Sequence, residues 1–460
     1  MASVLKIVAT NYLGAAGTTV DFISGGVYRI TSWSPAVAQR RVGEFGRGPY
    51  EDVEETMTIV ISGATALASL TALQAVLDQA RRWARGEPVG VVLLHYKPTA
   101  SSDELQTPLL GGVVELPSNF VNAPVVTVID PVTVTFTRVG LWYGAETALT
   151  DTTTTNPETA QVATFAALGA SAPVKVELEG IELNKASVNG SFLLVSSDEA
   201  SAGAASRIVV MSAESLVGNT GYTSVADASK FARGNVLRFT PSGTPGEAFE
   251  TIAPAGFTYN SRVRRWGVFV NYRNNSATTS FQVWAKLWHT YLNGGPGYTD
   301  TPRLIVPAGT SNPQWAFVGG GTLPDRLSRV SLMMEASAAS GSLDIDDVVV
   351  VAQDYPDSDI ALTLDGALGS IALTTTLVID PAVLSRLMPA VYITENDTPQ
   401  WLSYRGIAHL SMRENATSIA VAWLTNGYSS ATYWRALDTG NSPQNPLVRV
   451  TRTAAYLTPR

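Results

Sequence analysis

The sequence contains no cysteine, only three histidines and few charges, and each shortage excludes a class of chemistry. Without cysteine, the 460-residue chain has no disulfide scaffold, no thiolate metal site and no thiol nucleophile. His95, His289 and His409 lie far apart in the sequence, so no two of them have the short spacing of a metal-ligand pair. Charged residues make up 15% of the chain, against roughly 25% in ordinary soluble domains. The formal net charge of −8 argues against nucleic-acid binding, which needs a basic surface.

Long hydrophobic runs are missing as well. The N-terminal stretch turns polar too early for a secretory signal, and no run approaches about 18 consecutive apolar residues, so we expect no membrane span. The motifs of serine hydrolases, zinc proteases and phosphate-binding loops do not occur. We therefore expect neither an enzyme nor a cofactor, although the carboxylate pairs of glycoside hydrolases need no sequence motif.

Short alternating runs of valine, threonine, isoleucine and leucine dominate what is present. Residues 55–62 (ETMTIVIS), 125–136 and 279–287 alternate apolar and polar positions, and Gly, Pro or Asn separate such runs. Alternation with a period of two between turn residues is typical of antiparallel sandwiches and barrels. We predict an all-β protein with three parts. These are a β-sandwich with one packed α-helix, a jelly-roll β-sandwich in the middle, and a small β-rich C-terminal segment.

The exception is a helical pattern over residues 69–85 (SLTALQAVLDQARRWAR), where leucines recur three or four residues apart. Ser69 or Thr71 would cap its N-terminus, and Gly86 would end it. One amphipathic helix among strands is expected to close one end of a sheet or barrel.

Composition shifts suggest how the chain divides, at roughly 100–200 residues per domain. We assign residues 1–144 to the first domain and residues 145–172, rich in Thr and Ala, to a linker. Residues 173–353 form the predicted jelly roll, and residues 358–460 form the C-terminal segment. The sequence leaves open whether this last segment folds alone or completes the first domain.

Aromatic residues gather within the predicted jelly roll. They are Trp266, Tyr272, Trp284, Trp288, Tyr291, Tyr298 and Trp315. Alternation places Trp284 and Trp288 on one strand face with Gln282 and Lys286. Aromatic planes can stack on sugar rings while amides bind hydroxyls, so we single out a set of glycan contacts: Trp284, Trp288, Tyr272, Tyr291 and Gln282. The alternative is that these aromatics belong to the core or to subunit contacts, where Trp and Tyr are abundant.

Three acidic residues, Asp344, Asp346 and Asp347, close the same segment. Carboxylates are ligands for Ca²⁺, so this group is a metal candidate. We favour a simpler interpretation, in which Asp344 and Asp346 alternate with apolar neighbours on the exposed face of a strand. Asp347 breaks the alternation and would mark a β-bulge.

Several patterns in the first 144 residues carry a family resemblance. They include residues 28–40 (YRITSWSPAVAQR), residues 50–63 (YEDVEETMTIVISG), the helix ending in QARRW, and residues 109–116 (LLGGVVEL). In this order they resemble the minor tail and distal tail-type proteins of long-tailed double-stranded DNA bacteriophages and prophages. The resemblance contains no catalytic residue.

The resemblance implies an architectural role in the virion, at the tail tip. Such proteins form rings, hexamers or trimers, that join the tail tube to the hub and fibres, so tube, tape-measure, hub and fibre proteins are the implied partners. Residues 173–353 resemble the carbohydrate-binding-module-like jelly rolls inserted in such proteins, which implies contact with host-surface carbohydrate. The alternative is a stand-alone carbohydrate-binding or glycan-degrading protein.

Overall fold

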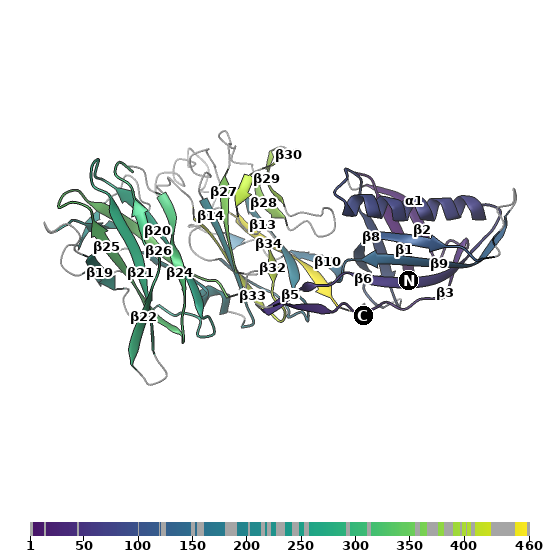
Figure 1. Ribbon diagram of the computed structural model, residues 1–460, viewed down its shortest axis with the longest axis horizontal. Coiled ribbons are helices and arrows are strands. Elements are labelled where there is room, and N and C mark those ends of the chain that lie inside the picture. The colour runs from purple at the N-terminus through teal and green to yellow at the C-terminus, as the bar shows by residue number, and fades with distance from the viewer. Residues whose placement is uncertain are drawn as a thin grey trace.

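The computed structural model describes residues 3–12, 15–43, 46–99, 101–118, 120, 126–148, 152–153, 161–179, 191–200, 203–212, 217–218, 222–226, 235–241, 248–252, 257–290, 295–310, 314–354, 359–365, 376–380, 390–395, 398–401, 403–405, 410–424 and 447–457. Figure 1 shows an elongated molecule, with the helix α1 (Ala66–Ala84) at one end and a series of sheets leading to the other. The marks for both chain ends lie at or beside the helical end.

The chain is all-β, as the sequence predicts. Apart from α1 and the short 3-10 helix η1 (Gly203–Ser206), the regular elements of the described residues are strands. None of the helices in this part of the chain has the length and hydropathy of a membrane span.

The N-terminal domain is a curved antiparallel sheet with the order β2-β1-β7-β8-β9-β6-β3. Its elements are β1 (Val4–Thr10), β2 (Ala16–Asp21), β3 (Tyr28–Ser32), β6 (Val53–Ser62), β7 (Val92–Lys97), β8 (Leu105–Glu115), β9 (Val128–Arg138) and a separate hairpin of β4 (Arg40–Gly43) and β5 (Gly46–Tyr50). Apolar positions such as Met57 on β6 and Val134 on β9 enter one core, which α1 also lines. Each large apolar side chain buried there stabilises the domain by roughly 1.5–3 kcal/mol.

The predicted helix is confirmed, and it packs chiefly along β8. It begins three residues earlier than expected, with Thr65 at the N-cap position and no side-chain capping bond, so neither Ser69 nor Thr71 is the cap. Gly86 follows its last turn with φ +79°, a left-handed conformation that glycine adopts without strain. An Arg81 guanidinium nitrogen donates to the Gly112 carbonyl at 2.7 Å and ties the last turn to β8.

Residues that carry the tail-protein resemblance meet in a buried polar network. The Trp33 indole N–H donates to one Glu55 carboxylate oxygen at 2.8 Å, and Arg138 Nε donates to the other at 2.7 Å. The Arg138 guanidinium also donates to the Ala36 carbonyl at 2.7 Å. The Tyr28 hydroxyl donates to the Ser69 carbonyl in the first turns of α1 at 2.8 Å. These hydrogen bonds hold the segment after β3 against β6 and β9, so the residues of the pattern that take part in them stabilise the fold.

A middle sandwich follows the N-terminal domain, and the C-terminal strand is built into it. One of its sheets continues the N-terminal sheet, because β10 (Trp142–Ala148) pairs with β8 and β34 (Leu447–Tyr456) pairs with β10. The strands beyond β34 are β13 (Ala172–Glu179), β28 (Thr376–Asp380), β29 (Ala390–Glu395) and β30 (Thr398–Trp401), with β11 (Thr152–Thr153) and β32 (Ser411–Met412) alongside. The second, five-stranded sheet has the order β12-β33-β14-β27-β31 and comprises β12 (Gln161–Thr164), β14 (Ser191–Asp198), β27 (Ile360–Asp365), β31 (Ser403–Arg405) and β33 (Ser418–Leu424).

This pairing divides the chain differently from the composition shifts. The segment 145–172 contains β11 and β12, which pair with β34 and β33. The strand β14 and all of β13 after its first residue lie inside the range assigned to the jelly roll, yet they pair with β33 and β34 and so join the C-terminal strands. These partners lie more than two hundred residues away in the sequence. A local alternation pattern carries no information about them.

The remaining strands form the jelly roll, inserted between β14 and β27. We name its two sheets by position. The junction sheet has the order β17-β18-β26-β20-β24 with β15 also on β26, and comprises β15 (Ile208–Ser212), β17 (Tyr222–Ala226), β18 (Asn235–Phe239), β20 (Arg265–Asn274), β24 (Gln314–Thr322) and β26 (Leu343–Ala352). The distal sheet has the order β16-β19-β25-β21-β22 with β23 also on β21, and comprises β16 (Val217–Gly218), β19 (Ala248–Ile252), β21 (Phe281–Thr290), β22 (Pro296–Asp300), β23 (Leu304–Val306) and β25 (Leu327–Ala336).

Both faces of the junction sheet are buried. On one face, Val348 and Val350 of β26 belong to the core shared with the distal sheet. On the other face, Val349 and Val351 pack in a second cluster with Phe269 and with Leu194, Ala420, Ala422 and Leu424 of the five-stranded sheet. The jelly roll thus rests on the middle sandwich through an apolar interface. The distal sheet is the outermost layer at the end of the molecule opposite to α1 (Figure 1).

Candidate functional site

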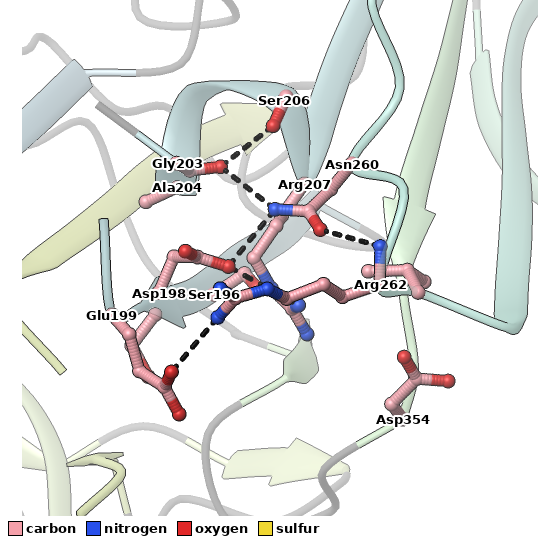
Figure 2. A network of polar contacts seen from close by, with 12 residues as sticks. Ser196, Asp198, Glu199, Gly203, Ala204, Ser206, Arg207, Asn260, Arg262 and Asp354 are labelled. Atoms are coloured by element: carbon pink, nitrogen blue, oxygen red, sulfur yellow. Dashed lines mark hydrogen bonds and ion pairs between the residues drawn. The ribbon is translucent and has the colours of Figure 1, made fainter. Parts of the chain in front are cut away.

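A buried polar network fixes the jelly roll where the chain passes into and out of it (Figure 2). Arg207, just before β15, donates from Nη2 to Asp359 Oδ2 at 2.7 Å and from Nε to Ser196 Oγ at 2.8 Å. A third atom, Nη1, lies 3.6 Å from Asp198 Oδ2. Ser196 and Asp198 belong to β14 and Asp359 immediately precedes β27, so one guanidinium joins both connections. The jelly roll is therefore held in place by charge as well as by apolar packing.

Further hydrogen bonds extend this network toward the jelly roll. The Asn260 side chain donates to Asp198 Oδ2 at 2.9 Å and accepts from the Arg262 backbone N–H at 3.0 Å (Figure 2). Arg413 Nη2 lies 3.3 Å from the same Asp198 oxygen. Asp198 is thus neutralised by arginines from two directions, which allows a carboxylate to lie in a buried position.

The outward face of the distal sheet, called the distal face below, carries aromatic and charged side chains in cross-strand rows. The register pairs Trp288 of β21 with Arg329 of β25 on one side and with Tyr298 of β22 on the other. The other rows are Ser331–Lys286–Asp300, Met333–Trp284 and Glu335–Gln282–Ile305. The alternate positions of β21 enter the jelly-roll core, as predicted; they are Phe281, Val283, Ala285 and Leu287.

Each aromatic ring of this face has a cationic group against it. The Arg303 guanidinium lies 4.3 Å from the ring centroid of Trp284, and the Arg329 guanidinium lies 4.1 Å from that of Trp288. Lys286 Nζ lies 4.7 Å from the centroid of Tyr298. Such cation–π contacts contribute roughly 0.5–1 kcal/mol each when exposed.

The rings differ in how much surface they leave open. Trp284 is 6% exposed, because Arg303 covers it while bonding to Gln282 and Glu335 at 2.9 Å each. Trp288 is half-buried and donates its indole N–H to Ser331 Oγ at 2.9 Å. Tyr298 is 47% exposed and its ring centroid lies 5.0 Å from that of Trp288. The open aromatic surface is thus Tyr298 with the adjoining part of Trp288.

The structure brings together only part of the predicted glycan set. Gln282, Trp284 and Trp288 share the distal face. Tyr272 lies in the junction sheet, on β20, and is 5% exposed, so it takes no part. The prediction that places Tyr291 in the site falls outside the described residues. Of the wider aromatic group, Trp266 and Trp315 are buried, in agreement with the core alternative.

The prediction that Asp344 and Asp346 lie on an exposed strand face is wrong. Asp344, Asp346 and Asp347 are all buried, because neighbouring strands and layers cover both faces of β26. The bulge is confirmed, since Asp346 and Asp347 together stand opposite Asn271 in the β20–β26 ladder. Asp344 accepts from Arg238 Nε and Nη2 at 2.7 and 2.9 Å and from Arg273.

These contacts also decide the charge of Asp344. Burial by itself would raise the pKa of Asp344, but hydrogen bonds from Arg238, Asn275 and Arg273 outweigh it and hold that pKa below its ordinary value. Two guanidinium groups already satisfy this carboxylate. Within the described residues, no group of three or more acidic or histidine side chains is placed to hold a metal ion.

Sequence reasoning missed the cations of the distal face, Arg303 and Arg329. Alternation along β25 could have found Arg329, because Arg329, Ser331 and Glu335 alternate with the core residues Val330, Leu332 and Met334. Nothing in the sequence points to Arg303, which reaches Trp284 from the segment between β22 and β23.

Comparisons with known proteins give structural likeness alone. No protein-family model and no curated protein matches the chain. One similar solved structure contains the CBM22-1–GH10 modules of endo-1,4-β-D-xylanase 10B from Clostridium thermocellum, complexed with xylohexaose. The match covers 31% of this chain and 27% of that chain, with 12% sequence identity and a TM-score of 0.25. The CBM22-1 xylan-binding domain of Paenibacillus barcinonensis Xyn10C matches 36% of this chain and 96% of its own, at 12% identity and TM-score 0.24.

A third similar structure is the enzymatically active domain of tailspike protein 4 of bacteriophage CBA120. The match covers 34% of this chain and 21% of that chain, with 12% sequence identity and a TM-score of 0.21. The chain thus spans less than a third of the xylanase and tailspike structures. These TM-scores are too low to establish a shared fold or function.

Proposed function

We propose that this chain is a structural protein of a phage tail tip that presents the distal face of its jelly roll to carbohydrate on a host surface. One observation supports the presentation role above all: the order of the layers. The chain ends lie at or beside the helical end, and the distal sheet lies at the other (Figure 1). The jelly roll is fixed to the middle sandwich by the apolar cluster around Val349 and by the Arg207 network. A rigid arm of this kind holds its outer face away from its base.

The distal face suits a carbohydrate ligand because it combines flat apolar rings with hydrogen-bonding groups. Tyr298 and Trp288 offer ring surface to the C–H face of a sugar, as amphipathic aromatics do in polar binding sites. Lys286 and Gln282 on the same strand face supply polar groups for hydroxyls. The opposite face of the jelly roll is covered by the middle sandwich, so the distal face is the broad sheet surface left for a ligand.

The tail-tip assignment rests on the sequence patterns of the first domain. The resemblance implies a β-domain with one packed helix, and this domain has that arrangement. Its patterned residues Trp33 and Glu55 hold the fold together, as a building block of an assembly requires. Low charge on surfaces that repeat in a ring limits repulsion between copies.

A glycan array probed with the full-length chain tests the carbohydrate role. We expect binding that Tyr298→Ala reduces by at least about fivefold, because stacking on one aromatic ring, by analogy with nucleobases, contributes on the order of 1–3 kcal/mol. Tyr12→Ala is the matched control, since Tyr12 is 71% exposed but belongs to the N-terminal domain. No glycan signal from the wild-type chain, or equal binding by Tyr298→Ala, would overturn this part of the proposal.

Immunogold electron microscopy of phage particles, with antibody against the chain, tests the tail-tip role. Label at the tail end distant from the capsid is the expected result. A chain that binds glycan but labels no particle would instead be a stand-alone carbohydrate-binding protein, and the tail-tip assignment would be rejected.

A further inference from the structure

The row Arg329–Trp288–Tyr298 crosses three neighbouring strands of the distal face. Arg329 on β25 and Tyr298 on β22 flank Trp288 on β21, and both are its direct cross-strand partners. Adjacent strands lie about 4.8 Å apart, so the outer two positions are separated by roughly 9–10 Å. The row therefore has the exposed ring of Tyr298 at one end, the indole of Trp288 in the middle, and the guanidinium of Arg329 at the other end.

The charge of Arg329 is the unusual feature of this row. The other two cations of the face have acidic partners: Arg303 lies 2.9 Å from Glu335, and Lys286 lies 3.7 Å from Glu250. Arg329 forms no ion pair with any of the described residues, and its guanidinium stacks on the ring of Trp288.

Among the described residues, two acidic side chains lie close to Arg329 in the strand register or in the sequence, and neither pairs with it. Asp300 lies on β22, two strands away from β25, and Asp325 in the turn before β25 lies 3.5 Å from Arg264. Arg329 thus presents a guanidinium whose position is set by stacking, while its N–H groups remain available to a ligand. A guanidinium held in this way can bind a carboxylate through two parallel hydrogen bonds.

We infer that the distal face selects an acidic polysaccharide, with one sugar ring on Tyr298 and the carboxylate of a neighbouring hexuronic acid unit on Arg329. This inference rests on the proposed carbohydrate role and names its substrate class. A planar carboxylate matches the fork of the guanidinium, and a pyranose ring matches the exposed face of Tyr298. Neutral polysaccharide would leave the Arg329 charge uncompensated.

Two forms of one polymer provide the test: polygalacturonate and the same polymer with its carboxylates fully methyl-esterified. They share a backbone and differ in charge. With the full-length chain in isothermal titration calorimetry, we expect at least tenfold tighter binding to the acid form, because hydrogen bonds to a charged carboxylate are stronger than those to a neutral ester.

Arg329→Met keeps the side-chain stem over Trp288 and removes the charge, and we expect it to abolish the preference between the two polymers. Arg329→Lys keeps the charge without the fork and should retain part of the preference. Arg326→Met, at an exposed arginine three residues earlier, is the matched control and should bind as the wild type does. Equal melting temperatures of the variants would show that all of them are folded.

Equal affinity for both polymers, or an Arg329→Met variant with wild-type preference, overturns the inference. The proposed function then still stands if binding to any polysaccharide depends on Tyr298. Binding to sulfated heparin or to phosphate-bearing teichoic acid that needs Arg329, without binding to polygalacturonate, overturns the carboxylate assignment. Absence of binding to all of these and to neutral xylan removes the proposed carbohydrate role itself.

Discussion

Arg207 and Asp359 form a fully buried ion pair, 2.7 Å between Nη2 and Oδ2, that joins the points at which the chain passes into and out of the jelly roll. Asp359 precedes β27, and Arg207 also contacts Asp198 and Ser196 at the end of β14. A single side chain thus crosslinks both connections of the insertion. The arrangement restrains the jelly roll on the middle sandwich, which is what a presentation arm needs.

Replacing Arg207 should therefore weaken the molecule at this junction. Arg207→Met leaves Asp359 buried without its guanidinium partner and removes one of the two arginines beside Asp198, and we expect a loss of about 3–5 kcal/mol in the free energy of unfolding. Urea unfolding followed by circular dichroism measures it. Arg262→Met is the control, because the ion pair of Arg262 with Glu199 is exposed and contributes at most about 1 kcal/mol. Equal midpoints for the two variants would show that the network does not hold the junction.

Trp284 is predicted to support the distal face rather than to bind sugar. Its ring is buried under Arg303, so Trp284→Ala should lower the free energy of unfolding by about 3–5 kcal/mol. Ile305→Ala, at a neighbouring position that is 68% exposed, should change it by no more than about 0.5 kcal/mol. Thermal unfolding by differential scanning calorimetry distinguishes them. A Trp284→Ala variant with wild-type stability and no glycan binding would instead place Trp284 in the binding surface.

Local patterns in the sequence were sufficient for elements and for single strand faces. Alternation along β21 identified which side enters the core, and the break at Asp347 located a bulge. Helical spacing identified α1 to within three residues at its start. Each of these features depends on residues that are close together in the sequence, so a single sequence contains the necessary information.

Features that depend on distant partners could not be predicted in this way. Asp344 alternates with apolar neighbours as an exposed residue would, but its strand is buried because separate layers cover both faces. Tyr272 shares the aromatic character of Trp288 and lies on the opposite sheet. Arg303 reaches Trp284 through a connecting segment that has no periodicity. Packing between layers decides the first two, a connecting segment decides the third, and the sequence pattern of one strand encodes neither.

His95 on β7 gives the N-terminal domain a pH dependence that can be measured. Burial lowers the pKa of His95 below its ordinary value of 6.5 and outweighs the hydrogen bond between His95 Nδ1 and Glu104, which is 2.8 Å long. As the pH falls below 6.5, the unfolded chain takes up a proton at His95 before the folded chain does, so stability decreases. The decrease in stability levels off below the pKa of His95 in the folded chain, where His95 is protonated in both states.

We expect hydrogen exchange in the β7 peptide, corrected for intrinsic rates, to be less protected at pH 5 than at pH 7. His95→Gln removes the titrating group while keeping a side chain that can bond to Glu104, so it should reduce this difference. Tyr298→Ala, on strand β22, which lies at the end of the molecule opposite to α1 (Figure 1), should leave the pH effect on β7 unchanged. The same loss of protection in His95→Gln as in the wild type would contradict the assignment, since another group would then have to take up the proton.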